Sequence, residues 1–333
     1  MHSIWYHNSE IAVIRFFHDD AMHGTHAEDS SWTFVCRYGI IKSNIELWFQ
    51  YKNYSEETQM KEAWAQSNRE QMPFVFYERV IFMTLQAFFT QYPRAAVAFS
   101  GGVDSAFVLW AAKKYGCDVR AYYVHSAFQP AFELEDAKKL TEQLDIPMTV
   151  IEVDILSVPK AVENGADRCY HCKHALFTTL WERVRADGYT VLLDGTNASD
   201  DASDRPGMRA LKELSVLSPL RLCGVTKAQV REQSRQADLF TWDKPAYACL
   251  ATRVPTGTPI TQDKLAKIER AEQALAELGF TDFRVRLAGN TARLEMTAAQ
   301  LAQAAARYEQ IIAALGADFD AVALDLTPRR ASR

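Results

Sequence analysis

The stretch VAFSGGVDSAFVLW, residues 97–110, decides the fold. Its first apolar run predicts a strand, the run after the two glycines predicts a helix, and the polar residues Ser100 to Ser105 form the turn between them. In an open α/β sheet, ligands bind at this kind of strand-to-helix turn. Gly101 and Gly102 let the backbone approach phosphate oxygens, and the helix N-terminus offers free N–H groups to an anion. The stretch therefore predicts a phosphate-binding loop.

Helices and strands alternate on both sides of this loop. The order predicts an α/β fold, a Rossmann-like parallel sheet with helices on both faces, followed by a smaller C-terminal α+β domain. The expected helices span residues 74–91, 103–115, 131–144, 175–186, 227–238, 262–278 and 298–315. The expected strands span residues 95–99, 119–124, 148–153, 190–193, 283–287, 292–296 and 321–326.

Three parts are expected along the chain. Residues 1–75 hold four of the seven tryptophans and five of the eight histidines without a sustained period, so they form an extension of uncertain structure. Residues 76–245 carry the alternating pattern and form the nucleotide-binding domain. Residues 246–330 form the C-terminal domain, and the Pro-, Gly- and Thr-rich stretch at 241–261 is an irregular connection.

The composition is that of a globular protein, with 48% hydrophobic and 24% charged residues and a net charge of -5. An acidic chain offers no electrostatic footprint for nucleic acid, so we expect no nucleic-acid partner. The N-terminus shows no basic region followed by an apolar one, and no apolar run is long enough to cross a bilayer. We therefore expect a cytoplasmic protein without a membrane partner.

Three cysteines form the second chemical signal. Cys169 and Cys172 are a C-x₂-C pair, which in a reducing compartment most often binds a metal or acts as a redox dithiol. Structural zinc needs four ligands, and the chain has no second C-x₂-C pair, although His171 and His174 are close in sequence. A third thiol, Cys249, lies in the irregular connection. Three thiols suit a [4Fe–4S] cluster with one open iron better than they suit a closed zinc site.

Taken together, the motifs resemble the LarE family, ATP-dependent sulfur transferases of nickel-pincer cofactor biosynthesis within the PP-loop ATP pyrophosphatases. The resemblance covers residues 95 to 326, about two-thirds of the chain, and residues 1–75 match nothing in the family pattern. The matching segments, in family order, are VAFSGGVDSA, RCYHCKHALF, DGTNASDDASDRPGMRA, LSPL, VTKAQVR, TWDKPAYACLATRVPTGTPIT, FRVRLAG and ARLEM.

The resemblance implies that ATP binds at the carboxyl edge of the sheet. The loop would hold the β,γ-phosphates, which leave as pyrophosphate, and Asp104 would help to hold Mg²⁺ on them. The loop contains no lysine, so it is not a Walker A loop. The residues expected to bind ATP are Ser100, Gly101, Gly102, Asp104, Ser105, Asp194, Gly195 and Thr196.

The resemblance also implies the substrate, pyridinium-3,5-biscarboxylic acid mononucleotide. Its carboxylate would be adenylated and then attacked by sulfur, giving a thiocarboxylate and AMP. Arg284 and Arg286 are two residues apart on an expected strand and so face the same side, where paired guanidinium groups suit an anionic substrate. Glu272 and Glu295 match family acids near this anion site and are expected to bind substrate or a metal.

Cys169, Cys172 and Cys249 are the expected catalytic residues, together with Asp104. Some family members sacrifice the sulfur of one cysteine, and others carry three cysteines and a [4Fe–4S] cluster. The pair and Cys249 place this chain with the second group, and direct sacrifice of Cys249 is the alternative. Family members assemble as hexamers, so we expect a homo-oligomer.

Three rival hypotheses stay open on the sequence alone. A tRNA-thiolating enzyme also combines a PP-loop with cluster-binding cysteines, although the acidic charge and the C-terminal motifs argue against it. An ammonia-using PP-loop amide synthetase would make the three cysteines incidental. A degenerate PP-loop binding module would be non-enzymatic, but the intact SGGVDS loop argues against that.

Overall fold

The computed structural model describes residues 34–36, 39–41, 83–200 and 206–329. Strands β1 (Phe34–Cys36) and β2 (Gly39–Ile41) form an antiparallel pair, and residues 83–329 belong to a separate compact unit. Most of the extension expected at 1–75, and the first part of the helix expected at 74–91, lie outside the described residues. The remainder of that helix is α2 (Leu85–Gln91).

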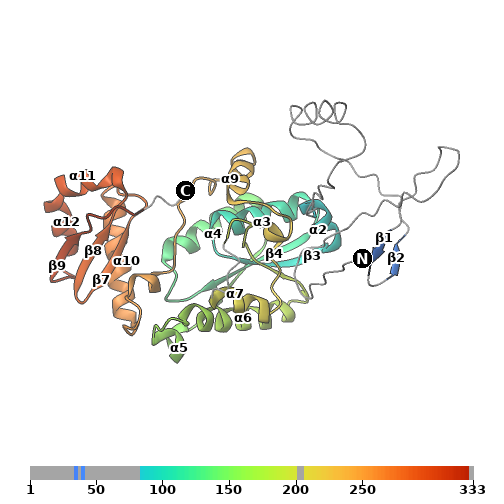
Figure 1. Ribbon diagram of the computed structural model, residues 1–333, viewed down its shortest axis with the longest axis horizontal. Helices are drawn as coiled ribbons and strands as arrows, with labels where there is room; N and C mark the ends of the chain where they lie inside the picture. Colours follow the sequence, from blue (N-terminus) through green and yellow to red (C-terminus); the bar gives the residue numbers. More distant parts are fainter. Residues whose placement is uncertain (1–33, 37–38, 42–82, 201–205, 330–333) are drawn as a thin grey trace, which may run out of the picture. The chain divides into compact units, whose positions relative to one another are not determined.

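A four-stranded parallel sheet carries the first domain (Figure 1). Its strands are β3 (Arg94–Phe99), β4 (Asp118–His125), β5 (Met148–Glu152) and β6 (Leu192–Leu193), in the order β5-β4-β3-β6. The chain leaves β3 towards β4 on one side and later returns to β6 on the other side. The strand order therefore reverses at β3, and the loop after β3 lies where open α/β sheets bind ligands.

Helices cover both faces of this sheet, which confirms the predicted α/β class (Figure 1). One face packs against α2, α3 (Val103–Lys114), α4 (Ala131–Leu144) and α9 (Lys227–Gln236). The other face packs against α6 (Arg168–Ala186) and α7 (Pro206–Glu213). The shorter helices are η1 (Ile155–Ser157), α5 (Pro159–Val162) and α8 (Pro219–Leu222). The central helix α3 is buried almost all round, so the loop before it rests on a rigid support.

The smaller C-terminal α+β domain is also confirmed. It follows η2 (Leu250–Arg253) and holds α10 (Gln262–Glu277), β7 (Arg284–Ala288), β8 (Thr291–Glu295), α11 (Ala298–Ala306), α12 (Tyr308–Leu315) and β9 (Ala321–Leu324). Strands β7 and β8 form an antiparallel hairpin, and β9 pairs with β8 in parallel. Ile268, Val285, Leu294 and Ile311 belong to its core.

Three local predictions were wrong. The helix expected at 175–186 begins at Arg168. Cys169 therefore lies in its first turn and Cys172 at the start of its second, and neither lies on a loop before the helix. The helix expected at 298–315 is interrupted at Arg307, whose side chain donates to the Leu278 carbonyl at the end of α10 at 2.6 Å. Helix α7 is not among the expected helices, and it begins at a proline, which is favoured at a first helical position.

We expect Gly195→Ala to disturb the contact between the end of β6 and α3. A Cβ atom at Gly195 would lie 2.7 Å from the Ser105 backbone nitrogen and 3.1 Å from the Asp104 carbonyl carbon. Backbone atoms cannot swing aside, so we expect the free energy of unfolding to fall by about 1–3 kcal/mol in urea denaturation. Gly165→Ala is the control, because nothing lies within 4 Å of its Cβ position. Equal stability of the two variants would contradict this packing.

Candidate active site

The loop after β3 is shaped by one glycine and two serines. Gly101 has φ of +74°, and a Cβ atom there would lie 2.9 Å from the carbonyl oxygen of Glu133, so this position requires glycine. Gly102 is the N-cap of α3 in extended conformation, and its Cβ position meets only Ser100 Oγ at 3.4 Å. Ser105 Oγ accepts from the Ser100 backbone N–H at 3.3 Å and donates to the Gly102 carbonyl at 3.2 Å. These bonds close the loop around the N-terminus of α3.

Asp104 lies in the first turn of α3 and is ion-paired. Its carboxylate accepts from Lys227 Nζ at 2.5 Å and from Asn197 Nδ2 at 3.3 Å. Burial raises the pKa of Asp104, and Lys227 opposes that shift. Lys227 begins α9, after an N-cap at Thr226 with a capping box. The VTKAQVR motif was recognised in the sequence, but Lys227 was given no role there, because nothing in the motif indicates a partner as far away in sequence as Asp104.

The residues expected after β6 come together beside the loop. Asp194 is buried and accepts from Ser218 Oγ at 2.7 Å, the Thr196 backbone N–H at 3.2 Å and Thr196 Oγ1 at 2.5 Å. Its carboxylate thus organises the turn after the strand. Gly195 packs against the Ser105 backbone. All eight residues predicted to bind ATP therefore lie on the β3–α3 loop, in the first turn of α3, or on the turn after β6 that adjoins them.

The C-x₂-C pair and Cys249 are brought towards each other by a network of two polar side chains. Arg168 Nη1 donates to Asn164 Oδ1 at 2.6 Å and to the Ala251 carbonyl at 2.9 Å. Asn164 is fully buried with φ of +57°, and its amide donates to the carbonyls of Pro255 at 2.8 Å and Thr258 at 2.9 Å. The network ties the start of α6 to the chain that follows Cys249.

The three thiols differ in exposure. Cys169 is exposed, whereas Cys172 and Cys249 are partly buried against the core of the C-terminal domain. Burial raises the pKa of Cys172 to about 12, and the nearby thiols of Cys249 and Cys169 add to that shift. Thiolates are the ligands that iron–sulfur clusters use. Within the described ranges, however, no three His, Cys, Asp or Glu side chains are grouped closely enough to hold a metal ion.

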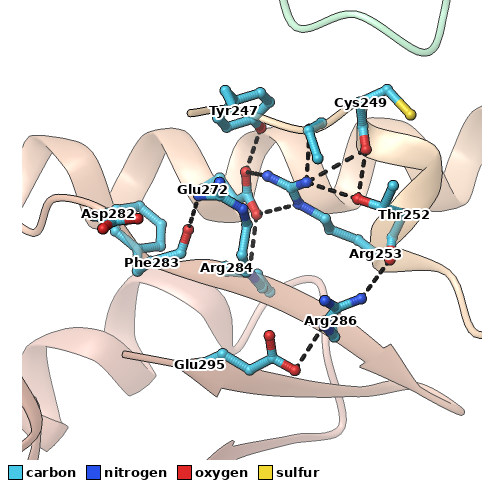
Figure 2. Close-up of polar contacts among 12 residues, drawn as sticks. Tyr247, Cys249, Thr252, Arg253, Glu272, Asp282, Phe283, Arg284, Arg286 and Glu295 are labelled. Carbon is cyan, nitrogen blue, oxygen red and sulfur yellow. Dashed lines mark hydrogen bonds and ion pairs between the residues drawn. The ribbon is translucent and has the colours of Figure 1, made fainter. Parts of the chain in front are cut away.

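A buried ion pair organises the segment that carries Cys249 (Figure 2). Arg253 donates to Glu272 through Nε at 2.8 Å and Nη2 at 3.0 Å, and its Nη1 reaches the Ala248 carbonyl at 2.7 Å. Glu272 also accepts from the Tyr247 hydroxyl and from the Val285 backbone N–H. Glu272, which was expected to bind substrate or metal, therefore has its oxygens occupied by protein donors. Figure 2 shows the Cys249 sulfur pointing away from this pair.

Arg284 and Arg286 both reach the same segment, as their spacing predicts, but their surroundings differ. Arg284 is buried and donates to the carbonyls of Phe283 at 2.6 Å and Ala246 at 2.5 Å. Burial, with the neighbouring Arg253, lowers the pKa of Arg284 to about 10. Arg286 donates to the Thr252 carbonyl at 2.6 Å and pairs with Glu295 at 2.7 Å. Both arginines therefore add positive charge beside the Tyr247–Arg253 segment (Figure 2).

Arg286 lines a cavity of about 470 Å³. Arg253, Arg293 and Glu295 contribute the other charged side chains of its wall, and Arg284 is not part of the lining. Arg293 was missed by sequence reasoning, although its strand position opposite Arg286 would have indicated a shared face. Arg253 is neutralised by Glu272 and has no exposed side-chain surface, so Arg286 and Arg293, which share Glu295, are the guanidinium groups of this wall that suit an anionic ligand.

Comparison with known proteins agrees with this geometry. Residues 94–163 match the family model described as queuosine biosynthesis protein QueC. An uncharacterised protein of Synechocystis sp. is 38% identical over 224 residues, covering 66% of this chain and 82% of that protein. The pyridinium-3,5-bisthiocarboxylic acid mononucleotide synthase of Lactiplantibacillus plantarum is 33% identical over 220 residues, covering 66% of this chain and 80% of the synthase. A probable tRNA sulfurtransferase of Thermoanaerobacter sp. is 25% identical over 202 residues, covering 57% of this chain and 52% of that protein.

The parallel sheet, the SGGVDS loop at its switch point and the matched family model define a PP-loop enzyme that uses ATP. Sulfur transfer is the activity common to the named relatives, and the protein is an ATP-dependent sulfur transferase. It belongs to the LarE family. No helix within residues 83–200 or 206–329 has the length and apolar character needed to cross a membrane.

Glu133 gives a pH-dependent prediction. Burial raises the pKa of this side chain from 4.5 to about 7, so the folded protein holds the Glu133 proton more tightly than the unfolded chain does. The free energy of unfolding should therefore fall as the pH rises through this range. We expect Glu133→Gln to be more stable than wild type above pH 7 by on the order of 1–3 kcal/mol, with the difference vanishing towards pH 4.5.

Urea denaturation near pH 5 and near pH 8 checks this expectation. Glu135→Gln is the matched control, because Glu135 lies on the same helix with its side chain 71% exposed. A stability difference for Glu133→Gln that does not change with pH would contradict the burial of its carboxyl group.

Proposed function

We propose that the protein adenylates the carboxylates of pyridinium-3,5-biscarboxylic acid mononucleotide and replaces a carboxylate oxygen by sulfur. The observation that carries this proposal is the presence, in one compact unit, of an intact phosphate loop, an arginine-lined cavity and a hydrogen bond that ties the start of the helix carrying Cys169 and Cys172 to the chain after Cys249. The relative at 33% identity is named for the bisthiocarboxylic product of such a reaction. The tRNA sulfurtransferases are more distant, and an acidic chain gives a polyanionic RNA no general attraction.

In the first step, a substrate carboxylate oxygen attacks the α-phosphorus of ATP, and pyrophosphate leaves. The Ser100–Ser105 loop and the N-terminus of α3 hold the departing phosphates through backbone N–H groups and serine hydroxyls. Asp104 provides carboxylate oxygens for Mg²⁺, which supplies positive charge to the phosphates when bound. The acyl-adenylate that results is a mixed anhydride, so the carbonyl carbon becomes electrophilic and AMP becomes a good leaving group.

The arginine-lined cavity binds the anionic substrate in this proposal. Arg286 and Arg293 face the phosphate or carboxylate groups of the mononucleotide, and Glu295 fixes both guanidinium groups by ion pairs at 2.7 and 2.9 Å. Arg284 acts through the chain, because it anchors the Ala246 carbonyl and with it the segment leading to Cys249.

In the second step, sulfur attacks the activated carbonyl carbon, the C–O bond to AMP breaks, and a thiocarboxylate forms. Cys169, Cys172 and Cys249 would hold the [4Fe–4S] cluster of this proposal, because thiolates are the ligands that such clusters use. A cluster with one open iron would supply a sulfide as the sulfur donor. The alternative donor is the Cys249 thiol itself, which would form a thioester as AMP leaves. Loss of its Cα proton and cleavage of its Cβ–S bond would then release the thiocarboxylate and leave dehydroalanine.

Serine substitutions at the three cysteines test the sulfur step. We expect Cys169→Ser, Cys172→Ser and Cys249→Ser each to lose the brown chromophore and thiocarboxylate formation in anaerobically purified protein, while AMP and pyrophosphate still form. Cys223→Ser is the matched control, since Cys223 is also partly buried but packs against the core of the ATPase domain. Asp104→Ala should instead stop pyrophosphate release.

A different pattern would support the alternative donor. A mass loss of about 34 Da at Cys249 alone, with Cys169→Ser and Cys172→Ser active for one turnover, would mean that Cys249 gives up its own sulfur. Normal thiocarboxylate formation by all three serine variants would overturn both sulfur hypotheses.

Arg286→Ala should weaken use of the mononucleotide and leave ATP binding intact. Loss of a charge-assisted contact of about 1.5–3 kcal/mol corresponds to a KM increase of roughly tenfold or more. Arg284→Ala, by contrast, should also lower the melting temperature, because two carbonyls lose their donor. Steady-state kinetics measures the KM of the mononucleotide in both variants, and calorimetric titration measures their affinity for ATP. An equal loss of ATP affinity in Arg286→Ala would place that residue in the nucleotide site.

A further inference from the structure

The phosphate loop has no cationic side chain of its own between Ser100 and Ser105. Loops that bind ATP phosphates commonly combine backbone N–H groups with a lysine, because the phosphates carry several negative charges. Two lysines from distant parts of this chain reach the loop. Lys227 pairs with Asp104, and Lys244 comes from the connection that follows α9.

Lys244 is held against the loop by three contacts. Its Nζ donates to the Gly101 carbonyl at 3.3 Å and pairs with Asp136 Oδ2 at 2.6 Å. It also lies over the Phe132 ring, 5.4 Å from the centroid. The Lys244 side chain is only 15% exposed. A largely buried ammonium group thus lies beside the glycine that gives the loop its shape, with Asp136 as its ion-pair partner and Glu133 of the same helix nearby.

The backbone of Lys244 stands where the chain passes from one domain to the other. Arg231 of α9 donates to the carbonyls of Trp242 at 2.6 Å and Lys244 at 2.9 Å. Two residues further on, Arg284 of β7 holds the Ala246 carbonyl, and the segment then continues to Cys249. The side chain of Lys244 therefore contacts the phosphate loop, while its backbone leads directly into the segment that carries Cys249.

We propose that Lys244 binds the phosphates of ATP and thereby links nucleotide binding to the position of the Cys249 segment. Asp136 neutralises the ammonium group when no nucleotide is present. Phosphate oxygens carry more charge than one carboxylate, so ATP draws Lys244 away from Asp136 and towards the loop. The inference rests on ATP use by this loop alone, and it holds whichever sulfur acceptor and sulfur donor the enzyme uses.

Nucleotide titration and hydrogen–deuterium exchange of the full-length protein test this proposal with Mg²⁺ and a non-hydrolysable ATP analogue. In wild type, we expect the nucleotide to slow exchange both in the loop, residues 99–106, and in the connection, residues 241–253. In Lys244→Met, we expect the dissociation constant to rise about tenfold or more. At saturating nucleotide, this variant should keep protection of the loop and lose protection of the connection.

Asp136→Asn separates a phosphate ligand from a merely structural ion pair. If Lys244 serves the phosphates, this variant binds the nucleotide as tightly as wild type or more tightly, and both segments stay protected. Lys138→Met is the matched control, because Lys138 lies on α4 and pairs with the exposed Glu135, and it should behave as wild type. Circular dichroism checks the folding of each variant, and Lys244→Gln replaces Lys244→Met if the latter is unfolded.

Three results would overturn the proposal. One is wild-type affinity and protection in the Lys244 variant. Another is an equal loss of affinity in Asp136→Asn and in the Lys244 variant, which would mean that the pair only supports the fold. The third is a wild-type connection whose exchange does not respond to the nucleotide. None of these readouts involves sulfur transfer, so failure here is distinguishable from failure of the proposed reaction.

Discussion

The buried ion pair between Arg253 and Glu272 is the interaction on which the arrangement of the Cys249 segment and the C-terminal domain depends. It joins η2, which follows Cys249, to α10, and Glu272 extends the link to β7 through the Val285 N–H. The Arg253 side chain has no exposed surface, so removal of either partner would leave an unpaired buried charge, at a cost of about 3–5 kcal/mol. With Tyr247 on the same carboxylate, the pair fixes the chain on both sides of Cys249.

A second set of contacts brings the thiols towards the same place. Arg168 and Asn164 hold the start of α6 against the residues after Cys249, so one side of the connection faces the C-x₂-C pair. The other side faces the arginines of β7. In the proposed reaction, the connection is therefore a shared boundary between the cysteines and the arginines that would bind the substrate. Its irregular backbone follows from this position, because it must satisfy partners on two domains.

The fold followed from the sequence because its signals are local. The apolar strand before Ser100 and the glycines after it predicted the β3–α3 turn, and the alternation of elements predicted the parallel sheet around it. The start of α6 was missed because Arg168 to His174 carry no apolar period, and their helix is stabilised by distant partners such as the Ala251 carbonyl. The break at Arg307 has the same origin, since the Leu278 carbonyl that binds its side chain is far away in sequence.

The candidate site was predictable only where a motif named its residues. The loop residues and the turn after β6 lie together as expected, because the carboxyl ends of neighbouring parallel strands meet at one edge. Spacing alone could not distinguish Arg284 from Arg286. Arg284 donates its hydrogen bonds to backbone carbonyls, whereas Arg286 lines a cavity. Nor could it reveal that Lys227, far along the chain from Asp104, neutralises this acid.

That Lys227–Asp104 pair has a consequence for the order of events at the loop. A bare carboxylate at the N-terminus of α3 would attract free Mg²⁺ and repel the phosphates of ATP, but here the lysine already balances its charge. Metal arriving alone must displace an ammonium group and gains no phosphate ligand in return. Metal arriving on the nucleotide frees that ammonium group to meet a new anion, so no cation is left unpaired. If Asp104 holds Mg²⁺ as proposed, the pair therefore favours entry of metal and nucleotide as one complex over binding of the metal alone.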